Sequence, residues 1–560
     1  MKKDIDCLLI GHNEIEFEEY ENVAVKMGLN SGAYRDLNLN YISWNNKPYT
    51  AAGIFNLFNG SEGKWKPLKK VETFSAAIAY LGSYLDGNGL NFEYVNSFQD
   101  DKEHLARILA QDNILTIAII TTLYVFALPI LEIIDFIKKY NRTAKIIVGG
   151  PFVATKIRTQ SDSALEYLFK EAIRADFFVN SSQGEKTLVK IIHALKNSIP
   201  PEQIENIYYI NGNRFGVTPV LKEDNKLSEN PVNWQLFSQR TGEHVNVRTS
   251  VSCPFSCSFC GFPEHAGKYQ TMDVDNIERE LNRLNEISAV KSLNIIDDTF
   301  NVPVKRFKKI LRMMIKNKYR FKWHSYFRCQ YADREMVELM KESGCEGVFL
   351  GIESGNEQIL KNMNKASSLE KYREGIALLK ECGIVTFGSF ITGFPGETSG
   401  TAGDTVEFIK ESGLDFYRTQ LWYCEPITPI WNEREKYKIK GESFEWTHSS
   451  MDSKSACNII DDMFLSIEDP IWIPQYNFDF DSIWHLIHRG MSLAEVKHFL
   501  RIFNRGVKEK LLNLGQKEVS YEVIKELKGI FRETANAGPD DDPGEEEINV
   551  VDKYDAGFDF

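Results

Sequence analysis

Short apolar runs alternate with amphipathic segments along most of this 560-residue chain, in two separate stretches. The first stretch covers about the first 220 residues, and the second begins near residue 245. Short apolar runs bounded by turn residues are typical of strands that are buried on both faces, and parallel strands need a helical connection between them. The alternation therefore predicts an α/β fold with two parallel sheets.

The first stretch is typical of a doubly wound, Rossmann-like sheet. Strands are predicted at residues 7–10, 91–95, 115–120, 146–148 and 177–179, with helices at 74–85, 130–140, 162–173 and 186–196. Residues 13–73 do not follow the alternation, and we interpret them as an irregular insertion. Ligands of doubly wound sheets bind beyond the carboxyl ends of the strands. The residues at these ends are Thr121, Thr122, Gly149, Gly150, Pro151, Ser181, Ser182, Gly184 and Glu185.

Residues 114–131 contain no charged side chain, and 18 uncharged residues lie at the lower limit for a membrane-spanning helix. Threonines interrupt the segment, Pro129 breaks a single helix, and Asp112 and Glu132 flank it without a basic excess. A buried strand, a threonine-rich turn and a helix that opens at Pro129 account for each of these features. We therefore expect a soluble, cytoplasmic protein without a membrane partner.

The second stretch predicts a partial (β/α)6 barrel. Its strands are expected at residues 245–250, 293–296, 322–327, 348–352, 385–391 and 419–422, with helices between them, such as 274–287 and 333–341. The chemistry of such a barrel belongs at the carboxyl ends of its strands. The expected domains are residues 1–220, 230–440 and a helical, aromatic C-terminal region at 441–560 that ends in an acidic tail.

Composition limits the partners of the chain. Its formal net charge is −13, which disfavours a broad nucleic-acid-binding surface. The apolar run before His12 is too short for a signal peptide. Nine cysteines are too few for a disulfide scaffold, and three of them fall within eight positions, which suggests a metal site.

These three cysteines are Cys253, Cys257 and Cys260, directly after the first barrel strand. Three thiolates on one loop can hold three irons of a cubane cluster and leave the fourth iron open to a ligand. Zinc is the alternative, with His265 as the nearest fourth ligand. The remaining cysteines of the barrel and the C-terminal region supply no second C-x-x-C pair; they are Cys329, Cys345, Cys382, Cys424 and Cys457.

The cysteine motif, with Phe259 before its last cysteine, resembles the signature of the radical S-adenosylmethionine (SAM) superfamily. Downstream segments are similar to that family's barrel: IDDTF with Asp297 and Asp298, Arg328 after HSYF, VFLGIESG with Glu353, and FGSFITGFPGET. Together they cover roughly residues 245–430.

This resemblance implies a 4Fe–4S cluster whose open iron binds SAM, and an electron donor such as flavodoxin or ferredoxin. It implies that Glu353 binds the ribose and that Arg328 binds the methionyl carboxylate. Alternatively, Glu353 caps a strand end and Arg328 pairs with Asp298. The full set of implied SAM contacts is Phe259, Asp297, Asp298, Arg328, Glu353, Ser354 and Ser389.

A doubly wound sheet ahead of such a barrel resembles the cobalamin-binding domain of class B radical SAM methyltransferases, through the segments FSAAIAYLGSYL, IIVGGP and ADFFVNSSQGEKTL. Ser182-Gln183-Gly184-Glu185 departs from the family's usual GEGE turn. The histidines His12, His104 and His193 do not fit the D-x-H-x-x-G motif of cobalamin mutases. The resemblance therefore implies cobalt without a lower histidine ligand, which favours methyl transfer. An empty supporting domain is the alternative.

The opening DCLLIGHNEIEFEEYE resembles the phosphinate P-methyltransferase branch. The implied activity is methyl transfer from methylcobalamin to an unactivated carbon or phosphorus centre of a small-molecule or peptide substrate, with Tyr423 and Trp446 as candidate substrate contacts. Alternatives are a cobalamin-dependent cyclisation or rearrangement, and a cobalamin and iron–sulfur redox sensor. Methyl transfer also requires that the sheet's carboxyl edge face the barrel mouth.

Overall fold

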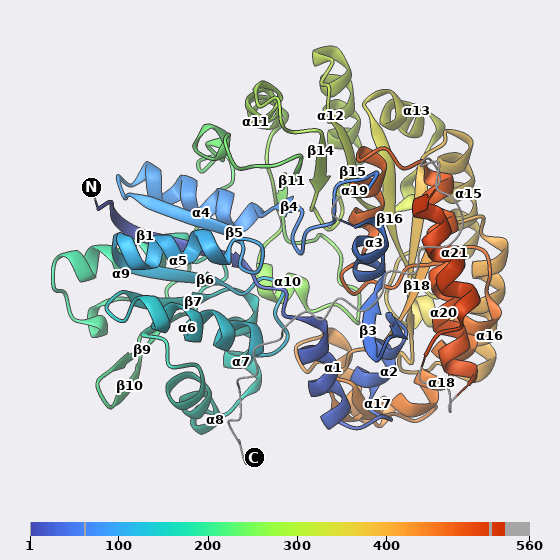
Figure 1. Ribbon diagram of the computed structural model, residues 1–560, viewed down its shortest axis with the longest axis horizontal. Coiled ribbons are helices and arrows are strands. Elements are labelled where there is room, and N and C mark those ends of the chain that lie inside the picture. Colours follow the sequence, from blue (N-terminus) through green and yellow to red (C-terminus); the bar gives the residue numbers. More distant parts are fainter. Residues whose placement is uncertain (1, 61–62, 514–517, 533–560) are drawn as a thin grey trace.

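The computed structural model describes residues 2–60, 63–513 and 518–532, which form two α/β lobes side by side (Figure 1). The lobe on the left of Figure 1 contains a seven-stranded sheet, and the lobe on the right contains an eight-stranded sheet. We call them the N-lobe and the barrel lobe. The α/β class with two sheets, predicted from the alternation, is confirmed.

The N-lobe sheet has the strand order β10-β9-β8-β7-β6-β1-β5. Five of its strands are parallel, and β9 and β10 add an antiparallel hairpin at one edge. The chain order reverses on either side of β1, so the topological switch point lies between β1 and β6, where doubly wound sheets bind ligands. The strands are β1 (Asp4–His12), β5 (Phe92–Ser97), β6 (Asn113–Ile120), β7 (Lys145–Gly149), β8 (Phe177–Val179), β9 (Ile207–Asn211) and β10 (Arg214–Val217).

Helices cover both faces of this sheet. One apolar cluster joins Cys7 and Leu9 to helices α4 and α9, and a second joins Leu8 and Ile10 to α5, α6 and α7. Neighbouring residues of β1 thus serve opposite faces, as strand geometry requires. The helices are α4 (Ala76–Gly87), α5 (Lys102–Gln111), α6 (Leu128–Tyr140), α7 (Pro151–Thr159) and α9 (Glu185–Lys196).

The uncharged segment 114–131 folds as the sequence predicts. It forms most of β6, a turn, and the start of α6 with Pro129 in its first turn. Thr116 is buried in β6 and donates its hydroxyl hydrogen to the carbonyl of Asp6, which satisfies a polar group inside the sheet. Within the described residues, no helix has the length and apolar character needed to span a membrane.

The barrel-lobe sheet has the order β21-β18-β17-β16-β15-β14-β11-β4, and its strands pair in parallel. Six of the strands are those that the sequence predicts. A two-residue strand extends each edge: β4 comes from the N-terminal segment and β21 from the C-terminal region. The bounds are β4 (Thr73–Phe74), β11 (His244–Val247), β14 (Ser292–Ile295), β15 (Lys322–Phe327), β16 (Cys345–Glu353), β17 (Val385–Thr392), β18 (Phe416–Leu421) and β21 (Ile471–Trp472).

Residues 13–73 contribute helices to the barrel lobe, where they lie in blue beside the C-terminal helices in Figure 1. Arg418 of β18 pairs with Asp36 at 2.5 Å, and Lys510 donates to the carbonyls of Asn38 and Tyr41. The chain therefore leaves the N-lobe after β1 and returns to it after β4. The elements of this excursion are α1 (Phe17–Lys26), α2 (Gly32–Asn38), β2 (Tyr41–Trp44), β3 (Lys47–Thr50) and α3 (Ala51–Asn59).

The C-terminal region packs against the barrel. Helix α19 (Phe480–His488) lies against the inner face of the barrel sheet, where Trp484 fills the space beside Gly347. Asp481 accepts hydrogen bonds from Asn294 and His324 of two barrel strands, at 2.8 and 3.0 Å. Three further helices belong to the same lobe: α18 (Ser453–Ser466), α20 (Leu493–Leu512) and α21 (Tyr521–Arg532). The acidic tail predicted from Pro539 onward lies outside the described residues.

Candidate active site

The three motif cysteines share one loop, between β12 (Ser250–Val251) and α10 (Phe262–Ala266), just past the carboxyl end of β11. Cys257 is buried, Cys253 and Cys260 are half-buried, and all three are free thiols. The Cys260 N–H donates to the Cys257 carbonyl at 3.1 Å, which closes a tight turn. The three cysteines therefore lie on one short loop past the end of the first barrel strand.

The electrostatics of the loop suit a cationic cluster. The pKa of Cys260 is raised to about 11, mainly by desolvation, and the charges of the neighbouring Cys257 and Asp298 contribute to this rise. Desolvation also raises the pKa of Cys253. Without a cation these thiols hold their protons at neutral pH, and a metal cluster would supply the positive charge that releases them.

Among the described residues, no three His, Cys, Asp or Glu side chains converge as a site for a metal ion. A cubane differs from a single ion because each thiolate binds a different iron. His265, the zinc alternative's fourth ligand, has its Nδ1 3.4 Å from a guanidinium nitrogen of Arg158. The donor set of three thiolates on one loop fits a cluster with one open iron.

Arg328 links the end of β15 to the cluster loop. Its Nη2 lies 3.6 Å from the Cys257 sulfur and 3.2 Å from the Lys365 carbonyl, and its guanidinium covers the Phe255 ring. Its Nη1 is buried and has no hydrogen-bond partner among the described residues. A buried donor without a partner is costly, and an amino-acid carboxylate of SAM would satisfy it.

Glu353 ends β16 in a left-handed conformation, with φ of +72°, beside an irregularity in the register with β17. A non-glycine residue in this region is strained, and such strain concentrates at functional sites. The Glu353 carboxylate pairs with Lys365 at 2.7 Å, and both side chains are at most 10% exposed. Lys365 Nζ also lies 5.5 Å from the Phe259 ring centre. Glu353 therefore faces a buried cation that the sequence did not indicate.

Two adjacent acids at the end of β14 occupy different settings. Asp297 is buried and accepts the N–H groups of Thr249 and Ser250 at 2.6 and 3.0 Å, so it ties two strand ends together. Asp298 is exposed, and its carboxyl accepts a hydrogen bond only from its own backbone N–H among the described residues. Its pKa is raised to about 7, mainly by desolvation and also by the charge of Asp297. Asp298 is therefore the carboxyl of this pair that is free to meet a ligand.

The two serines expected at the SAM site are both buried. Ser354 accepts the Asn356 N–H at 3.2 Å, which helps to begin helix α14 (Glu357–Asn362). Ser389 lies in β17, paired in register with Gly351 of β16. Ser354 thus has a role in the fold, while Ser389 lies in the strand beside the one that Glu353 ends.

Thr121, Gly149 and Gly150 form one compact unit at the carboxyl edge of the N-lobe sheet. The Thr121 hydroxyl and backbone N–H both donate to the Gly149 carbonyl, at 2.9 and 3.0 Å. Gly150 has φ of +118°, and a Cβ there would lie 2.8 Å from the Thr121 oxygen, so only glycine fits. Thr122 and Pro151 are exposed beside this unit, where a ligand could reach them.

The turn from Ser181 to Glu185 lies at the next strand end and leads into α9. Gly184 has φ of +88°, and the exposed Ser182 lies at the tip. Asn225 of the interlobe linker donates its amide hydrogen to Glu185 at 3.0 Å. Desolvation raises the pKa of Glu185, and the charge of Arg248 in the barrel lobe partly offsets this. The turn is thus held against the linker and lies close to the first barrel strand.

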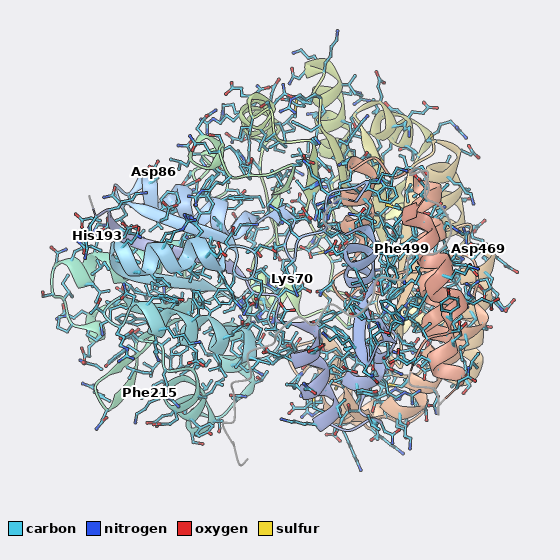
Figure 2. All side chains as sticks on the ribbon, viewed as in Figure 1. Lys70, Asp86, His193, Phe215, Asp469 and Phe499 are labelled. Atoms are coloured by element: carbon cyan, nitrogen blue, oxygen red, sulfur yellow. The ribbon has the colours of Figure 1, made fainter. Side chains whose placement is uncertain are left out.

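The carboxyl edge of the N-lobe sheet faces the cluster loop. Arg158 of α7 donates to the Glu264 carbonyl of α10 at 2.9 Å, four residues after Cys260. At the same seam, the Tyr20 ring stacks on Phe126 at 5.3 Å and on Tyr476 at 5.1 Å. Figure 2 labels Lys70 between the lobes, where it donates to Glu16 at 2.9 Å. This arrangement is the one that the methyl-transfer hypothesis requires.

The two candidate substrate contacts differ in exposure. Trp446 is 2% exposed, and its indole N–H donates to the Trp422 carbonyl at 2.9 Å, so it belongs to the core. Tyr423 is 36% exposed, with its ring edge-on to Phe444 at 5.0 Å. Of the two, only Tyr423 has surface available to a substrate in this conformation.

The sequence analysis did not identify Tyr326 as a candidate site residue. It is 40% exposed although it lies within β15, and its ring centre is 4.9 Å from that of Phe349. It shares a face of the strand with His324, which contacts α19, and with Arg328 at the cluster. The positions 324, 326 and 328 alternate along the strand, and this two-residue period was the sequence pattern that could have indicated Tyr326.

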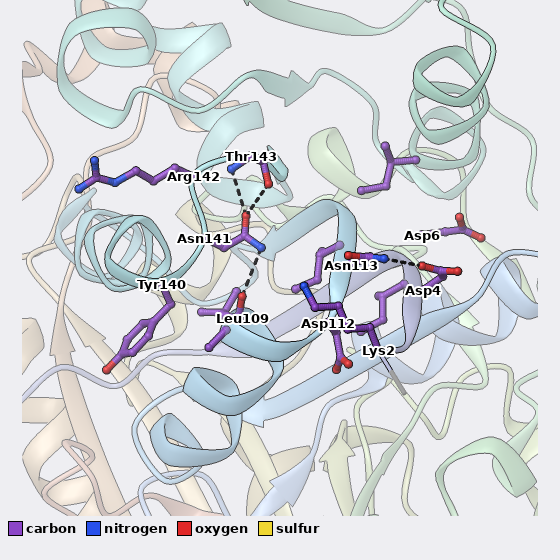
Figure 3. Close-up of a pocket in the computed structure, with 14 residues that line it drawn as sticks. Lys2, Asp4, Asp6, Leu109, Asp112, Asn113, Tyr140, Asn141, Arg142 and Thr143 are labelled. Atoms are coloured by element: carbon purple, nitrogen blue, oxygen red, sulfur yellow. Dashed lines mark hydrogen bonds between the residues drawn. The ribbon is translucent and has the colours of Figure 1, made fainter.

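A surface pocket of about 560 Å³ lies on the opposite edge of the N-lobe sheet, beside the amino ends of β1 and β6 (Figure 3). Its polar side chains bond to one another: Asn113 donates to Asp4 at 3.0 Å, and the Thr143 hydroxyl donates to Asn141 at 3.2 Å. This pocket is therefore separate from the edge that faces the cluster loop.

Residues 247–409 match the family model of the radical SAM superfamily. The match contains the cluster loop, Arg328, Glu353 and the strands up to β17. The matched residues all lie within the barrel lobe.

Three relatives align with more of the chain. An uncharacterized methyltransferase of Pyrococcus horikoshii is 26% identical over 52% of this chain and 64% of its own length. A putative methylthiotransferase of Methanocaldococcus jannaschii is 28% identical over 64% of this chain and 76% of its own length. An anaerobic magnesium-protoporphyrin IX monomethyl ester cyclase of Cereibacter sphaeroides is 24% identical over 66% of this chain and 60% of its own length. Part of each relative thus lies outside the match.

Two solved structures share the fold. The cobalamin-dependent SAM radical enzyme OxsB, with aqua-cobalamin bound, superposes on 94% of this chain and 79% of its own, with a TM-score of 0.56 and 13% identity. The radical SAM methyltransferase TsrM from Kitasatospora setae, with cobalamin and a 4Fe–4S cluster bound, superposes on 65% of this chain and 75% of its own, with a TM-score of 0.52 and 18% identity. At these identities the likeness concerns the fold, and it includes the arrangement of a sheet domain ahead of the barrel.

Proposed function

We propose that this protein is a cobalamin-dependent radical SAM methyltransferase. The observation that carries the proposal is the contact between α7 of the N-lobe and α10 beside the cluster loop, through Arg158 and Glu264. It brings the edge where a doubly wound sheet binds its ligand to the mouth where a radical SAM barrel binds its own. A substrate held between the two edges would meet both.

When bound, the cluster and SAM supply a 5′-deoxyadenosyl radical, and cobalamin supplies the methyl group. Cys253, Cys257 and Cys260 would hold the cluster. The free Nη1 of Arg328 would bind the SAM carboxylate, and Glu353, oriented by Lys365, would accept hydrogen bonds from the ribose hydroxyls.

On the N-lobe, the backbone at Gly149–Gly150 would approach the corrin because neither residue carries a side chain. The exposed Thr122, Pro151 and Ser182 lie beside this edge and complete the proposed cobalamin contacts.

The acceptor is proposed to be an unactivated carbon or phosphorus centre in a small molecule or peptide, as in natural-product biosynthesis. The phosphinate branch rests on the resemblance of the opening segment alone. Solved structures of TsrM include one with its tryptophan substrate and a SAM analogue, so a carbon acceptor in an amino acid or peptide deserves the first trial.

The test is anaerobic incubation of the reconstituted protein with methyl-labelled SAM, dithionite and candidate substrates. We expect 5′-deoxyadenosine and a product heavier by the labelled methyl group. A Cys253→Ala/Cys257→Ala/Cys260→Ala variant serves as the control and should give neither. Formation of 5′-deoxyadenosine without labelled product from any acceptor would count against methyl transfer.

A second candidate is radical cyclisation with cobalamin but without net methylation. The observation in its favour is the alignment with a cyclase over 66% of this chain. The same labelling experiment separates the two, because cyclisation changes the substrate's hydrogen count and leaves the methyl label on the methionine released from SAM. A redox sensor, the remaining alternative, would turn over neither SAM nor substrate.

A further inference from the structure

A row of three aromatic rings crosses the inner face of the barrel sheet. Tyr326 of β15 is paired in register with Phe349 of β16, and Phe349 with Phe387 of β17. Neighbouring ring centres lie 4.9 and 4.7 Å apart, and Phe480 of α19 stacks on Phe387 at 5.7 Å. Phe387 is fully buried and Phe349 is half-buried, whereas Tyr326 is exposed although its strand lies inside the sheet. The row is therefore covered by α19 at one end and open at Tyr326.

The next layer of the same face contains proposed SAM contacts. Arg328, Gly351 and Ser389 each lie two residues beyond a ring of the row, a rise of about 6.6 Å along a parallel strand. A Cβ on Gly351 would lie 2.6 Å from a carboxylate oxygen of Glu353, so this carboxylate folds back over the strand at that level. A ligand held by these residues would therefore lie next to the open ring of Tyr326.

The Tyr326 hydroxyl makes no hydrogen bond to a described residue, and its surroundings disfavour a negative charge. Desolvation raises the pKa of Tyr326, and the charges of Asp481, Asp479 and Asp298 contribute, so the phenol keeps its hydrogen at neutral pH. The loss of a neutral hydrogen atom leaves no charge on the oxygen. The environment that opposes loss of a proton therefore does not oppose loss of a hydrogen atom.

A phenolic O–H bond is weaker than the C–H bond of a methyl group, so a primary carbon radical that reaches a phenol takes its hydrogen atom. The proposed function generates such a radical, and the present inference rests on that function. We propose that Tyr326 is a catalytic residue that donates its phenolic hydrogen atom to the 5′-deoxyadenosyl radical when no acceptor is bound. Tyr326 would then protect the protein from an unused radical.

The transfer balances without a further reactant. The O–H bond of Tyr326 breaks, a C–H bond forms at the 5′ carbon, and a neutral tyrosyl radical remains. One electron from the reductant and one proton from water then restore the phenol.

The test is turnover of the full-length, reconstituted protein with SAM and dithionite in heavy water, without acceptor and without added thiol. The phenolic hydrogen exchanges with heavy water, so transfer from Tyr326 places deuterium on the 5′ carbon, whereas transfer from a carbon-bound hydrogen does not. The variant is Tyr326→Phe, which keeps the ring beside Phe349 and removes only the unpartnered hydroxyl. The matched control is Tyr140→Phe, at an exposed tyrosine on the opposite edge of the N-lobe sheet (Figure 3).

We expect mass spectrometry to find deuterium in the 5′-deoxyadenosine from the unmodified protein and from Tyr140→Phe, and to find it lost in Tyr326→Phe. Iron content and the SAM dissociation constant, measured by calorimetry, should be equal in the three proteins. Equal deuterium in Tyr326→Phe, or none in the unmodified protein, overturns the proposal. Weaker SAM binding by Tyr326→Phe also overturns it, because the hydroxyl would then hold SAM rather than quench its radical.

Failure of the proposed function gives a different result. If the unmodified protein forms no 5′-deoxyadenosine, both proposals fall. If deuterated 5′-deoxyadenosine forms but no candidate acceptor is methylated, methyl transfer is contradicted and the role of Tyr326 stands.

Discussion

At the residue scale, an ion pair with Lys365 fixes the side chain of Glu353, a residue with a strained backbone. The 2.7 Å pair is almost fully buried, and it holds the carboxylate of a residue whose φ is +72°. Burying an ion pair costs free energy. Removing one of the two charges costs more, because the other charge then stays in the interior without a partner. The resemblance could supply Glu353 from its strand-end motif. It could not identify Lys365 as the partner, because Lys365 lies 12 positions further along the chain and no sequence pattern links the two residues.

Lys365→Met is expected to destabilise the protein by about 3 kcal/mol, because it leaves the Glu353 carboxylate buried and unpaired. Lys365→Arg should restore most of that stability. Urea unfolding of the cluster-free protein measures the stability of both variants. The SAM affinity of the reconstituted protein, measured by calorimetry, should be lowered more by Lys365→Met than by Lys365→Arg. A Met variant as stable as the unmodified protein would contradict this account.

The cysteines give a second residue-scale prediction. Replacing Cys253, Cys257 and Cys260 by alanine should remove the brown chromophore and lower bound iron from about four per chain to near zero. Cys345→Ala is the control, since Cys345 is buried in β16 and its thiol contacts the Gly347 carbonyl. Iron analysis after anaerobic reconstitution tests which cysteines bind the cluster. Loss of iron from the Cys345 variant would overturn the ligand assignment.

At the element scale, long strands with strong apolar patterns could be predicted and short ones could not. The six predicted barrel strands are present, whereas β4 and β21 have two residues each, too few for any periodicity. Residues 13–73 were interpreted as an irregular insertion, yet they form three helices and a hairpin that pack on the barrel lobe. Their partners, such as Arg418 and Lys510, lie hundreds of residues away, and only the tertiary fold brings them together.

Helix α19 gives an element-scale prediction about pH. His485 of α19 packs on His244 of β11 with ring centres 4.2 Å apart, and His244 is stacked with His488 at 5.4 Å. Desolvation lowers the pKa of His244 to about 3, and the nearby charges of His488 and Arg489 contribute. Desolvation lowers the pKa of His485 too. Asp481, Glu346 and Thr73 also face this group, as partners of His324, His488 and His485.

Because the folded-state pKa of His244 lies below the usual value of about 6.5, the unfolded chain binds more protons as the pH falls. The contribution of His244 is therefore complete above about pH 6.5 and is lost as the pH falls toward 3. We expect the protonation difference at His244 alone to lower the free energy of unfolding by about 2 kcal/mol between pH 7 and pH 5. Urea unfolding at both pH values should show this loss. His244→Gln should reduce the loss, while His498→Gln, at an exposed position of α20, should not. An equal pH dependence in all three proteins would refute the assignment to His244.

At the scale of the whole molecule, the two lobes share one reaction space only if their seam is rigid. The seam is built from Arg158 and Glu264, and from the Phe126, Tyr20 and Tyr476 ring stack. These contacts join the N-lobe, the excursion at 13–73 and the barrel lobe. The sequence suggested that the edges must face each other for methyl transfer, and it offered no means of identifying the residues that hold them.

The last prediction concerns this seam. Arg158→Ala removes the hydrogen bond from α7 to α10 but touches no proposed cofactor contact, so iron and cobalamin content should remain as in the unmodified protein. Transfer to a substrate held between two sites depends steeply on alignment, so methylation should fall about tenfold while 5′-deoxyadenosine formation stays nearly constant. The ratio of 5′-deoxyadenosine to methylated product, measured by mass spectrometry, should therefore rise. Arg142→Ala, at the opposite edge of the N-lobe sheet (Figure 3), is the matched control and should leave the ratio unchanged. If Arg158→Ala also leaves it unchanged, the α7–α10 contact does not align the two sites, and the aromatic stack becomes the part of the seam that must do so.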